Sequence, residues 1–144
     1  MPCDKAQVFG VLLTLAGCVG AAPMERQVVV SEPGFPTVSE ADLGVRAFAV
    51  DAAGRRREVV GAHCDVSSEL YSTRLTTPAR LVVPNLGSRS PMLRFDCRAD
   101  GLRGEAESAI TTRWRTHPFG YQAYGWEGPS YPVSAYPDVS VLLR

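Results

Sequence analysis

The chain has 144 residues, and its 15 Lys and Arg residues balance its 15 Asp and Glu residues, so its formal net charge at pH 7 is zero. A neutral protein has no net field that would draw it to nucleic acid, and we therefore expect no nucleic-acid partner. The length is that of a single domain able to bury its own hydrophobic core.

An apolar run opens the chain and extends from Val8 to Ala16. A secretory signal needs roughly 7–15 apolar residues before a small-residue cleavage site, whereas a membrane-spanning helix needs about 20. The run therefore fits an export signal and is too short to span a bilayer. It ends in Leu15-Ala16-Gly17-Cys18, which resembles the lipobox of bacterial lipoproteins.

The lipobox resemblance implies how the chain is processed. Residues 1–17 would form a helical signal peptide that is removed before Cys18, leaving 127 of the 144 residues. Cys18 would carry a diacylglycerol group and an N-acyl chain, with no other cofactor, and residues 18–27 would be a lipidated tether. The alternatives are an ordinary signal peptide cleaved near Ala21 or Ala22, and an uncleaved anchor.

The same resemblance implies a location and the first partners. Membrane lipid would hold the protein through Cys18, because several acyl chains anchor firmly where one chain anchors only marginally. In this family an Asp directly after the cysteine favours retention at the inner membrane, and the residue here is Val19. We therefore expect the lipoprotein processing and sorting machinery to deliver the protein to the outer membrane, where it would face the periplasm or the cell surface.

After the tether, short segments alternate apolar and polar residues with the periodicity of half-buried strands. Residues 28–30 are β-prone and predict a first strand, and residues 31–44 contain Pro and Gly residues typical of a loop. Residues 45–50 predict a strand, 51–54 a turn, and 56–60 the returning arm of a hairpin.

Turn signals such as Asp100-Gly101 separate the later segments of strand character. The expected strands are 62–66, 70–76, 80–83, 92–98, 102–112 and 139–143, with Pro78 interrupting the chain between the second and third. Short, regularly spaced strands favour an all-β fold. We predict a small single-domain sandwich, Ig-like in type, made of residues 28–116 and 138–144, with a small barrel as the alternative.

The cysteines also indicate export. Cys3 would be lost with the signal peptide and Cys18 would be the anchor, which leaves Cys64 and Cys97. Two cysteines in an oxidising compartment most simply form one disulfide, which would stabilise the fold by roughly 4 kcal/mol through loop closure. Two free buried thiols or a catalytic thiol are the alternatives.

The segment between these two cysteines carries a second resemblance. Cys64, Thr77-Pro78, the run Leu-Val-Val-Pro at 81–84, and Cys97 with Gly101 after it follow one another in this order. The order is similar to that of small alphaproteobacterial lipoproteins, whose β-domain is of the surface-associated PEGA type. The resemblance implies a PEGA-like sandwich, and it transfers no catalytic residue.

Residues 117–137 are rich in aromatic residues, Gly and Pro, without strand or helix periodicity, and we predict a long loop. Rings present large rigid surfaces with polar handles, and long loops are often functional. The candidate binding residues are Phe119, Tyr121, Tyr124, Trp126 and Tyr131. The expected ligands are sugar rings of cell-wall glycan or an envelope protein; alternatively, the rings lie over the β-core or the segment is partly disordered.

Residues with catalytic chemistry are few. His63 and Cys64 are neighbours in a strand and so point to opposite faces, and His117 has no paired cysteine ligands. We therefore predict neither a nucleophilic pair nor a metal site. Some hydrolases use a pair of nearby carboxylates, and four residues here could be considered for such a pair. They are better explained as solvated residues on the outer faces of strands: Asp96, Asp100, Glu105 and Glu107.

The basic cluster Arg55-Arg56-Arg57 is either a solvated turn or a contact for phosphate or lipid head groups. Together these features predict a lipid-anchored cell-envelope protein with a structural, accessory or binding role and no catalysis. The alternatives are a lipid-tethered enzyme acting on the cell wall and an anchored subunit of a larger envelope complex. A subunit would leave an apolar patch exposed, for which Trp114 and the aromatic loop are the candidates.

Overall fold

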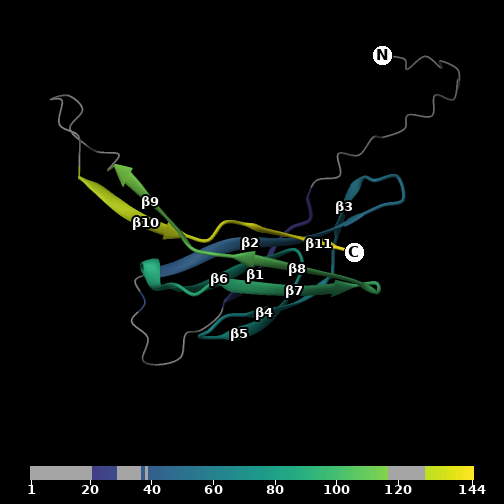
Figure 1. The fold of residues 1–144 in the computed structure, drawn as a ribbon, viewed down its shortest axis with the longest axis horizontal. Coiled ribbons are helices and arrows are strands. Elements are labelled where there is room, and N and C mark those ends of the chain that lie inside the picture. Colours follow the sequence, from purple (N-terminus) through teal and green to yellow (C-terminus); the bar gives the residue numbers. More distant parts are fainter. Residues whose placement is uncertain (1–20, 29–36, 38, 117–128) are drawn as a thin grey trace, which may run out of the picture.

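The computed structural model describes residues 21–28, 37, 39–116 and 129–144, and these ranges are mostly β-structure (Figure 1). The strands are β1 (Glu25–Val28), β2 (Ser39–Val50), β3 (Arg56–Val59), β4 (His63–Ser67), β5 (Ser72–Thr76), β6 (Ala79–Asn85), β7 (Leu93–Ala99), β8 (Leu102–Ser108), β9 (Thr111–Thr116), β10 (Ser130–Ala135) and β11 (Val139–Leu143). A short 3-10 turn, η1 (Gly87–Arg89), follows β6. No helix in the described ranges is long and apolar enough to cross a membrane. The expected signal helix, residues 1–17, and Cys18 lie outside these ranges.

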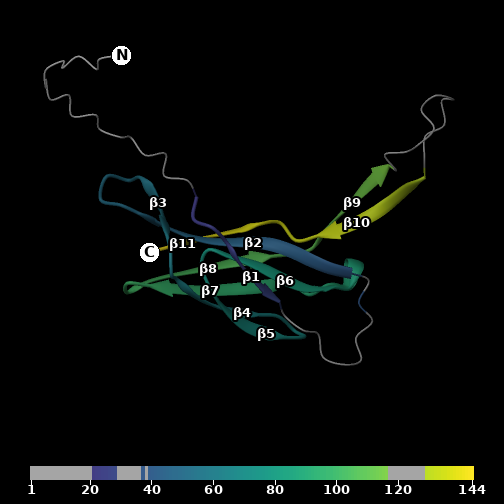
Figure 2. The ribbon, with the colours of Figure 1, turned by 180° about the vertical axis from the view of Figure 1, so that it is seen from behind.

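Two sheets form a β-sandwich, which confirms the predicted all-β class (Figures 1 and 2). Sheet A has the order β1-β6-β2-β11, with β3 also pairing with β2, and sheet B has the order β5-β4-β7-β8. The predicted hairpin across 45–60 is present, because β3 returns antiparallel to the end of β2. The outermost strands of sheet A, β1 and β11, instead run parallel to their neighbours.

The hydrophobic core lies between the sheets and follows the alternation of the sequence. In β2, Leu43, Val45 and Ala47 are buried, while Arg46 and Phe48 between and after them are half-buried on the outer face. Burying one large apolar side chain stabilises the folded state by roughly 1.5–3 kcal/mol. The alternation of apolar and polar residues therefore determines which face of each strand turns inward. The largest fully buried side chains are Phe95, Leu43, Leu81, Leu93 and Leu143.

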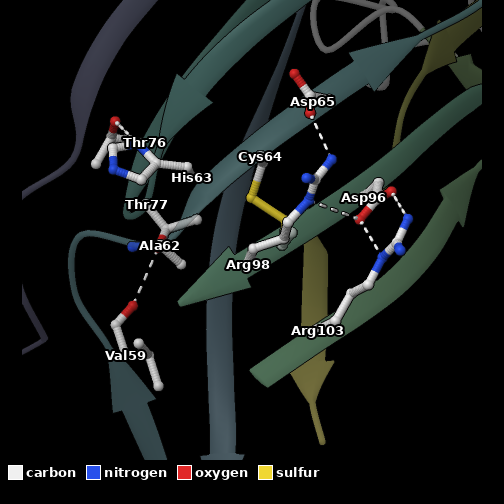
Figure 3. The surroundings of a disulfide bond; sticks show 11 residues. Val59, Ala62, His63, Cys64, Asp65, Thr76, Thr77, Asp96, Arg98 and Arg103 are labelled. Carbon is white, nitrogen blue, oxygen red and sulfur yellow. Dashed lines mark hydrogen bonds and ion pairs between the residues drawn. A yellow bond between two sulfur atoms is a disulfide. The ribbon is translucent and has the colours of Figure 1, made fainter. Parts of the chain in front are cut away.

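Cys64 in β4 and Cys97 in β7 form a disulfide between directly opposite positions of sheet B (Figure 3). Both residues are buried in the core. The disulfide prediction is therefore confirmed, and the bridge links neighbouring strands of one sheet. Neither sulfur is available as a thiolate nucleophile in this state.

The chain changes sheets beside Thr77, between β3 and β4 and again between β5 and β6. The buried Thr77 hydroxyl donates to the Val59 carbonyl at 3.0 Å and accepts from the Ala62 N–H at 3.2 Å, so it joins the two crossovers (Figure 3). Pro78, which follows a cis peptide bond, separates β5 from β6 as predicted.

Hydrogen bonds link the two sheets along both long sides of the sandwich. On one side, the backbones of Arg103 in β8 and Arg144 after β11 exchange two N–H to carbonyl hydrogen bonds, of 3.1 and 3.0 Å. The sheets approach here because Gly104 has no side chain: a Cβ at that position would lie 2.3 Å from the Leu142 carbonyl oxygen. On the other side, the Gln27 amide in β1 donates to the Thr73 hydroxyl at 3.1 Å and to a backbone carbonyl of β5.

Two predicted boundaries near the N-terminus are wrong. β1 covers Glu25–Val28, so residues 25–27 belong to the sandwich and not to the tether. β2 begins at Ser39, so the second part of the predicted 31–44 loop is a strand. Gly44 suggested a loop, yet it lies inside β2, where it pairs with β6 and where a Cβ would meet the Met24 side chain at 3.0 Å.

Two further predictions near the C-terminus need correction. The expected strand 102–112 is two strands, because β8 ends at Ser108 and β9 begins at Thr111. The predicted loop 117–137 contains a strand, β10, which pairs antiparallel with β9 in a two-stranded ribbon separate from both sheets. Residues 117–128 of the predicted loop lie outside the described ranges.

Candidate functional site: an exposed aromatic and basic ribbon

The β9–β10 ribbon leaves the sandwich at one end of its long axis (Figures 1 and 2). All six residues of β9 are exposed, and none of β10 is fully buried. A two-stranded ribbon is only marginally stable in water, so this one depends on how its base is attached to the sandwich.

Side chains at the base of the ribbon attach it firmly. The Asn85 amide, at the end of β6, donates to the Ser134 carbonyl at 3.0 Å, and the hydroxyls of Ser134 and Thr112 lie 2.8 Å apart. The ring of Tyr136, directly after β10, is buried with 4% of its surface exposed, and its hydroxyl donates to the Pro91 carbonyl. The base is therefore part of the core, while the ribbon beyond it is solvated.

Trp114 is the most exposed large apolar side chain among the described residues, with 71% of its surface accessible. It lies opposite Pro132 in the ribbon, on a face that otherwise carries Thr and Ser hydroxyls. Because successive residues of a strand face opposite sides, Arg113 and Arg115 share the other face with Tyr131 and Val133, the residues they oppose. The ribbon thus presents an indole on one side and two guanidinium groups on the other.

The ribbon arginines differ from those on the outer face of sheet B. On the outer face of sheet B, Arg98 pairs with Asp65 at 3.2 Å and with Asp96 at 3.7 Å, and Arg103 also pairs with Asp96 (Figure 3). Arg74 pairs with Asp65 at 3.0 Å. Arg113 and Arg115 have no carboxylate within ion-pair distance among the described residues, although Glu127 in the connecting segment lies outside those ranges. Within the described ranges, no protein carboxylate neutralises the guanidinium groups of the ribbon.

The residues expected to bind fall into three groups. Tyr131 lies on β10 and is 39% exposed, which suits a role in binding. Tyr136, in the same aromatic segment, packs into the core instead. Phe119, Tyr121, Tyr124 and Trp126 lie outside the described residues. The sequence argument missed Arg113 and Arg115, which a β-prone Thr-Thr-Arg-Trp-Arg-Thr run without buried apolar positions could have indicated.

Two of the residues considered for catalysis, Asp96 and His63, lie in neighbouring strands of sheet B. Hydrogen bonding from Arg103, with the nearby charge of Arg98, holds the pKa of Asp96 below its ordinary value, whereas a general acid needs a raised one. His63 is exposed, and among the described residues the one hydrogen-bond partner of its ring is the Thr76 hydroxyl, at 3.4 Å. Within the described ranges no three His, Cys, Asp or Glu residues are placed to share a metal ion, and His117 lies outside those ranges.

Two tyrosines near the base of the ribbon, the half-buried Tyr71 and the buried Tyr136, stay protonated. Burial raises the pKa of Tyr71 above its ordinary value, and the neighbouring Tyr136 adds to the shift. Burial also raises the pKa of Tyr136, although its contact with Ser90 acts in the opposite direction. Neither phenol can serve as a base at neutral pH. The Tyr136 hydroxyl donates to the Pro91 carbonyl, whereas the buried hydroxyl of Tyr71 has no hydrogen-bond partner among the described residues.

No protein-family model and no curated protein matches the chain. Among solved structures, catechol 1,2-dioxygenase from Pseudomonas arvilla C-1 is similar over 87% of this chain and 59% of its own, with 13% identity and a TM-score of 0.41. Catechol 1,2-dioxygenase from Acinetobacter sp. ADP1, inhibited by bound mercury, is similar over 85% and 59%, with 12% identity and a TM-score of 0.40. The chain therefore spans 59% of the length of either enzyme, and at these values the similarity supports no conclusion about activity.

Proposed function

We propose that this protein is a lipid-anchored component of the cell envelope whose sandwich holds the β9–β10 ribbon as a binding element for cell-wall glycan. The observation that carries the proposal is Trp114, exposed between two arginines on a ribbon whose base is fixed in the core. The protein would act by binding, without catalysis of its own.

The anchor is supported by two independent features. The lipobox ending in Cys18 supplies the acylation site. The buried disulfide between Cys64 and Cys97 is a bond that persists in oxidising compartments and is rare in the cytosol. Export followed by acylation accounts for both.

The chemistry of the ribbon suits an acidic glycan. Sugar rings stack on aromatic faces, and an exposed indole offers such a face without losing much conformational freedom on binding. Carboxylates on the glycan or its attached peptides pair with guanidinium groups, which form strong, charge-assisted hydrogen bonds. Trp114 and the pair Arg113 and Arg115 would supply these contacts from opposite sides of the ribbon.

The anchor is tested by feeding cells an alkynyl fatty acid and measuring the mass of the mature N-terminus. We expect Cys18→Ser to abolish labelling, because the acylated thiol is lost. Cys3→Ser is the matched control, since it removes a cysteine of the same segment and should keep the label. Labelling that survives Cys18→Ser would contradict the proposal.

Binding is tested by co-sedimentation of the detergent-solubilised protein with purified cell wall. Trp114→Ala should reduce the bound fraction about tenfold, the effect of losing roughly 1–2 kcal/mol of ring contact. Val60→Ala, which shortens another exposed apolar side chain far from the ribbon, should not. If wild type does not sediment with cell wall but Trp114→Ala abolishes a specific protein crosslink, the ribbon serves an envelope complex and the glycan assignment is wrong.

A further inference from the structure

The N-terminal segment of the described chain lies along the outer face of sheet A. Arg46 in β2 donates a hydrogen bond of 3.2 Å to the Ala22 carbonyl, and Met24 lies against Gly44, two residues earlier in β2. Going backward along the chain from Met24 to Ala22 therefore leads along β2 toward its end, where the β2–β3 hairpin turns (Figure 1).

The distance from this point to the acylation site is short. Four residue steps separate Ala22 from Cys18. An extended chain spans at most about 3.6 Å per residue, so Cys18 lies within about 14 Å of Ala22. A lipid on Cys18 would therefore bring this end of the sandwich close to the membrane surface.

The β2–β3 hairpin at this end carries the cluster Arg55-Arg56-Arg57. Asp51 holds Arg55 through a 3.1 Å ion pair and also fixes the turn, by accepting from the Ala53 and Arg55 N–H groups at 2.9 and 2.8 Å. Arg56 has its guanidinium 4.1 Å from the centre of the Phe48 ring. These contacts hold the hairpin in one shape with its arginines at the surface.

The carboxylates of the hairpin are already occupied. Glu58 pairs with Arg46, and Asp51 pairs with Arg55. Among the described residues, Arg56 and Arg57 have no ion-pair partner.

Two exposed apolar side chains flank these arginines. Val50 lies opposite Arg56 and is 53% exposed, and Val60, just after β3, is 64% exposed. Unpaired guanidinium groups beside exposed apolar side chains match the chemistry of a bilayer interface.

We propose that the β2–β3 hairpin is a second membrane contact, which binds the phosphates of anionic phospholipid head groups through Arg56 and Arg57. The proposal rests on the lipid anchor proposed above. Guanidinium groups recognise phosphate by strong hydrogen bonds, and each arginine near an anionic surface increases membrane partition about fivefold. With the hairpin end on the membrane, the β9–β10 ribbon at the other end of the long axis points away from it (Figures 1 and 2).

The test uses the purified, lipidated wild-type protein and the arginine reagent phenylglyoxal. Modification rates are measured by mass spectrometry in detergent micelles, in phosphatidylcholine vesicles, and in such vesicles containing phosphatidylglycerol. We expect Arg56 and Arg57 to react at least about fivefold more slowly in the anionic vesicles. Arg113 and Arg115 are internal controls at the opposite end and should keep their rates.

Intact mass of the same sample reports whether Cys18 carries lipid, so the two proposals fail separately. A lipidated protein whose Arg56 and Arg57 react equally fast in anionic vesicles and in micelles would overturn the hairpin contact and leave the anchor standing. Equal protection in both vesicle types would overturn the assignment to anionic head groups. A chain without lipid on Cys18 would overturn both proposals.

Salt supplies a second measurement. High salt screens surface charges, so the protection of Arg56 and Arg57 should be lost near 1 M salt, where the Debye length is about 3 Å. The acylated protein should remain on the vesicles, because burial of acyl chains does not depend on ionic strength in this way. Protection that persists in high salt would contradict an electrostatic contact.

Discussion

Gly104 offers a sharp test of how the two sheets are joined. A Cβ at this position would lie 2.3 Å from the carbonyl oxygen and 2.8 Å from the carbonyl carbon of Leu142, and 3.1 Å from a methyl group of Val141. The nearest atoms belong to backbone, which cannot rotate away as a flexible side chain could. In Gly104→Ala, β8 and β11 must therefore move apart.

The cost can be worked out from the contacts that separation would disturb. Overpacking of a core costs roughly 1–3 kcal/mol, and each of the two backbone hydrogen bonds between Arg103 and Arg144 contributes about 1 kcal/mol. Replacing Gly by Ala also lowers the conformational entropy of the unfolded chain, which offsets about 0.4–1 kcal/mol of this loss of stability. We expect Gly104→Ala to lower the free energy of unfolding by about 2–4 kcal/mol.

The assay uses a soluble form of the protein, which carries Cys18→Ser and is secreted through an ordinary signal peptide. Its unfolding in urea is monitored by far-UV circular dichroism. Gly54→Ala is the matched control: nothing lies within 4 Å of its Cβ, but its φ of 77° is unfavourable for Ala, so it should cost only about 1–2 kcal/mol. The reasoning is refuted if Gly104→Ala is within about 0.5 kcal/mol of wild type, the ordinary range for a surface substitution.

Three other changes test the disulfide, the base of the ribbon and the charged face. Replacing Cys64 and Cys97 together by Ala should lower the free energy of unfolding by up to about 4 kcal/mol in urea, because a 33-residue separation is no longer closed in the unfolded chain. Tyr136→Phe leaves a buried backbone carbonyl without its donor and should cost about 1–3 kcal/mol in the same assay. Arg103 depresses the pKa of Asp96. Their ion pair therefore stabilises the folded protein at pH values above the ordinary carboxyl pKa, and this stabilisation is lost as the pH falls through the depressed pKa. Asp96→Asn should therefore destabilise the protein slightly at neutral pH and not at about pH 2, and an equal effect at both would contradict the ion pair.

The local sequence pattern was sufficient to predict the fold where neighbouring strands are joined by tight turns. The alternation of 45–50 and the turn at 51–54 predict the β2–β3 hairpin, and Asp100-Gly101 predicts the turn between β7 and β8. Asp100 and Gly101 both have positive φ, of 50° and 78°, as a tight hairpin turn requires. In these places the chemistry of a few adjacent residues determines the backbone.

Pattern failed where a strand depends on distant partners. The first half of β2 contains Gly44, which a local argument assigns to a loop, but Met24 packs against it and the Asp138 carboxylate accepts from its N–H at 2.6 Å. Pro132 likewise argues against a strand, and yet β10 tolerates it because, among the described strands, β10 pairs with β9 alone. Neither fact can be read from residues adjacent in sequence.

The zero net charge of the chain conceals an uneven distribution of charge that bears on how the protein would work. Across the outer face of sheet B, arginines and aspartates alternate in a row of ion pairs, formed by Arg74, Asp65, Arg98, Asp96 and Arg103. Figure 3 shows the part of this row that runs from Asp65 to Arg103. Such exposed pairs contribute only about 0–1 kcal/mol each to stability. Their larger consequence is that they neutralise the broad face of the sandwich, whereas the hairpin and the described part of the ribbon keep arginines without a carboxylate partner. Anionic surfaces would therefore be attracted to the two ends of the molecule, and the proposed anchor at one end would leave the other end to bind.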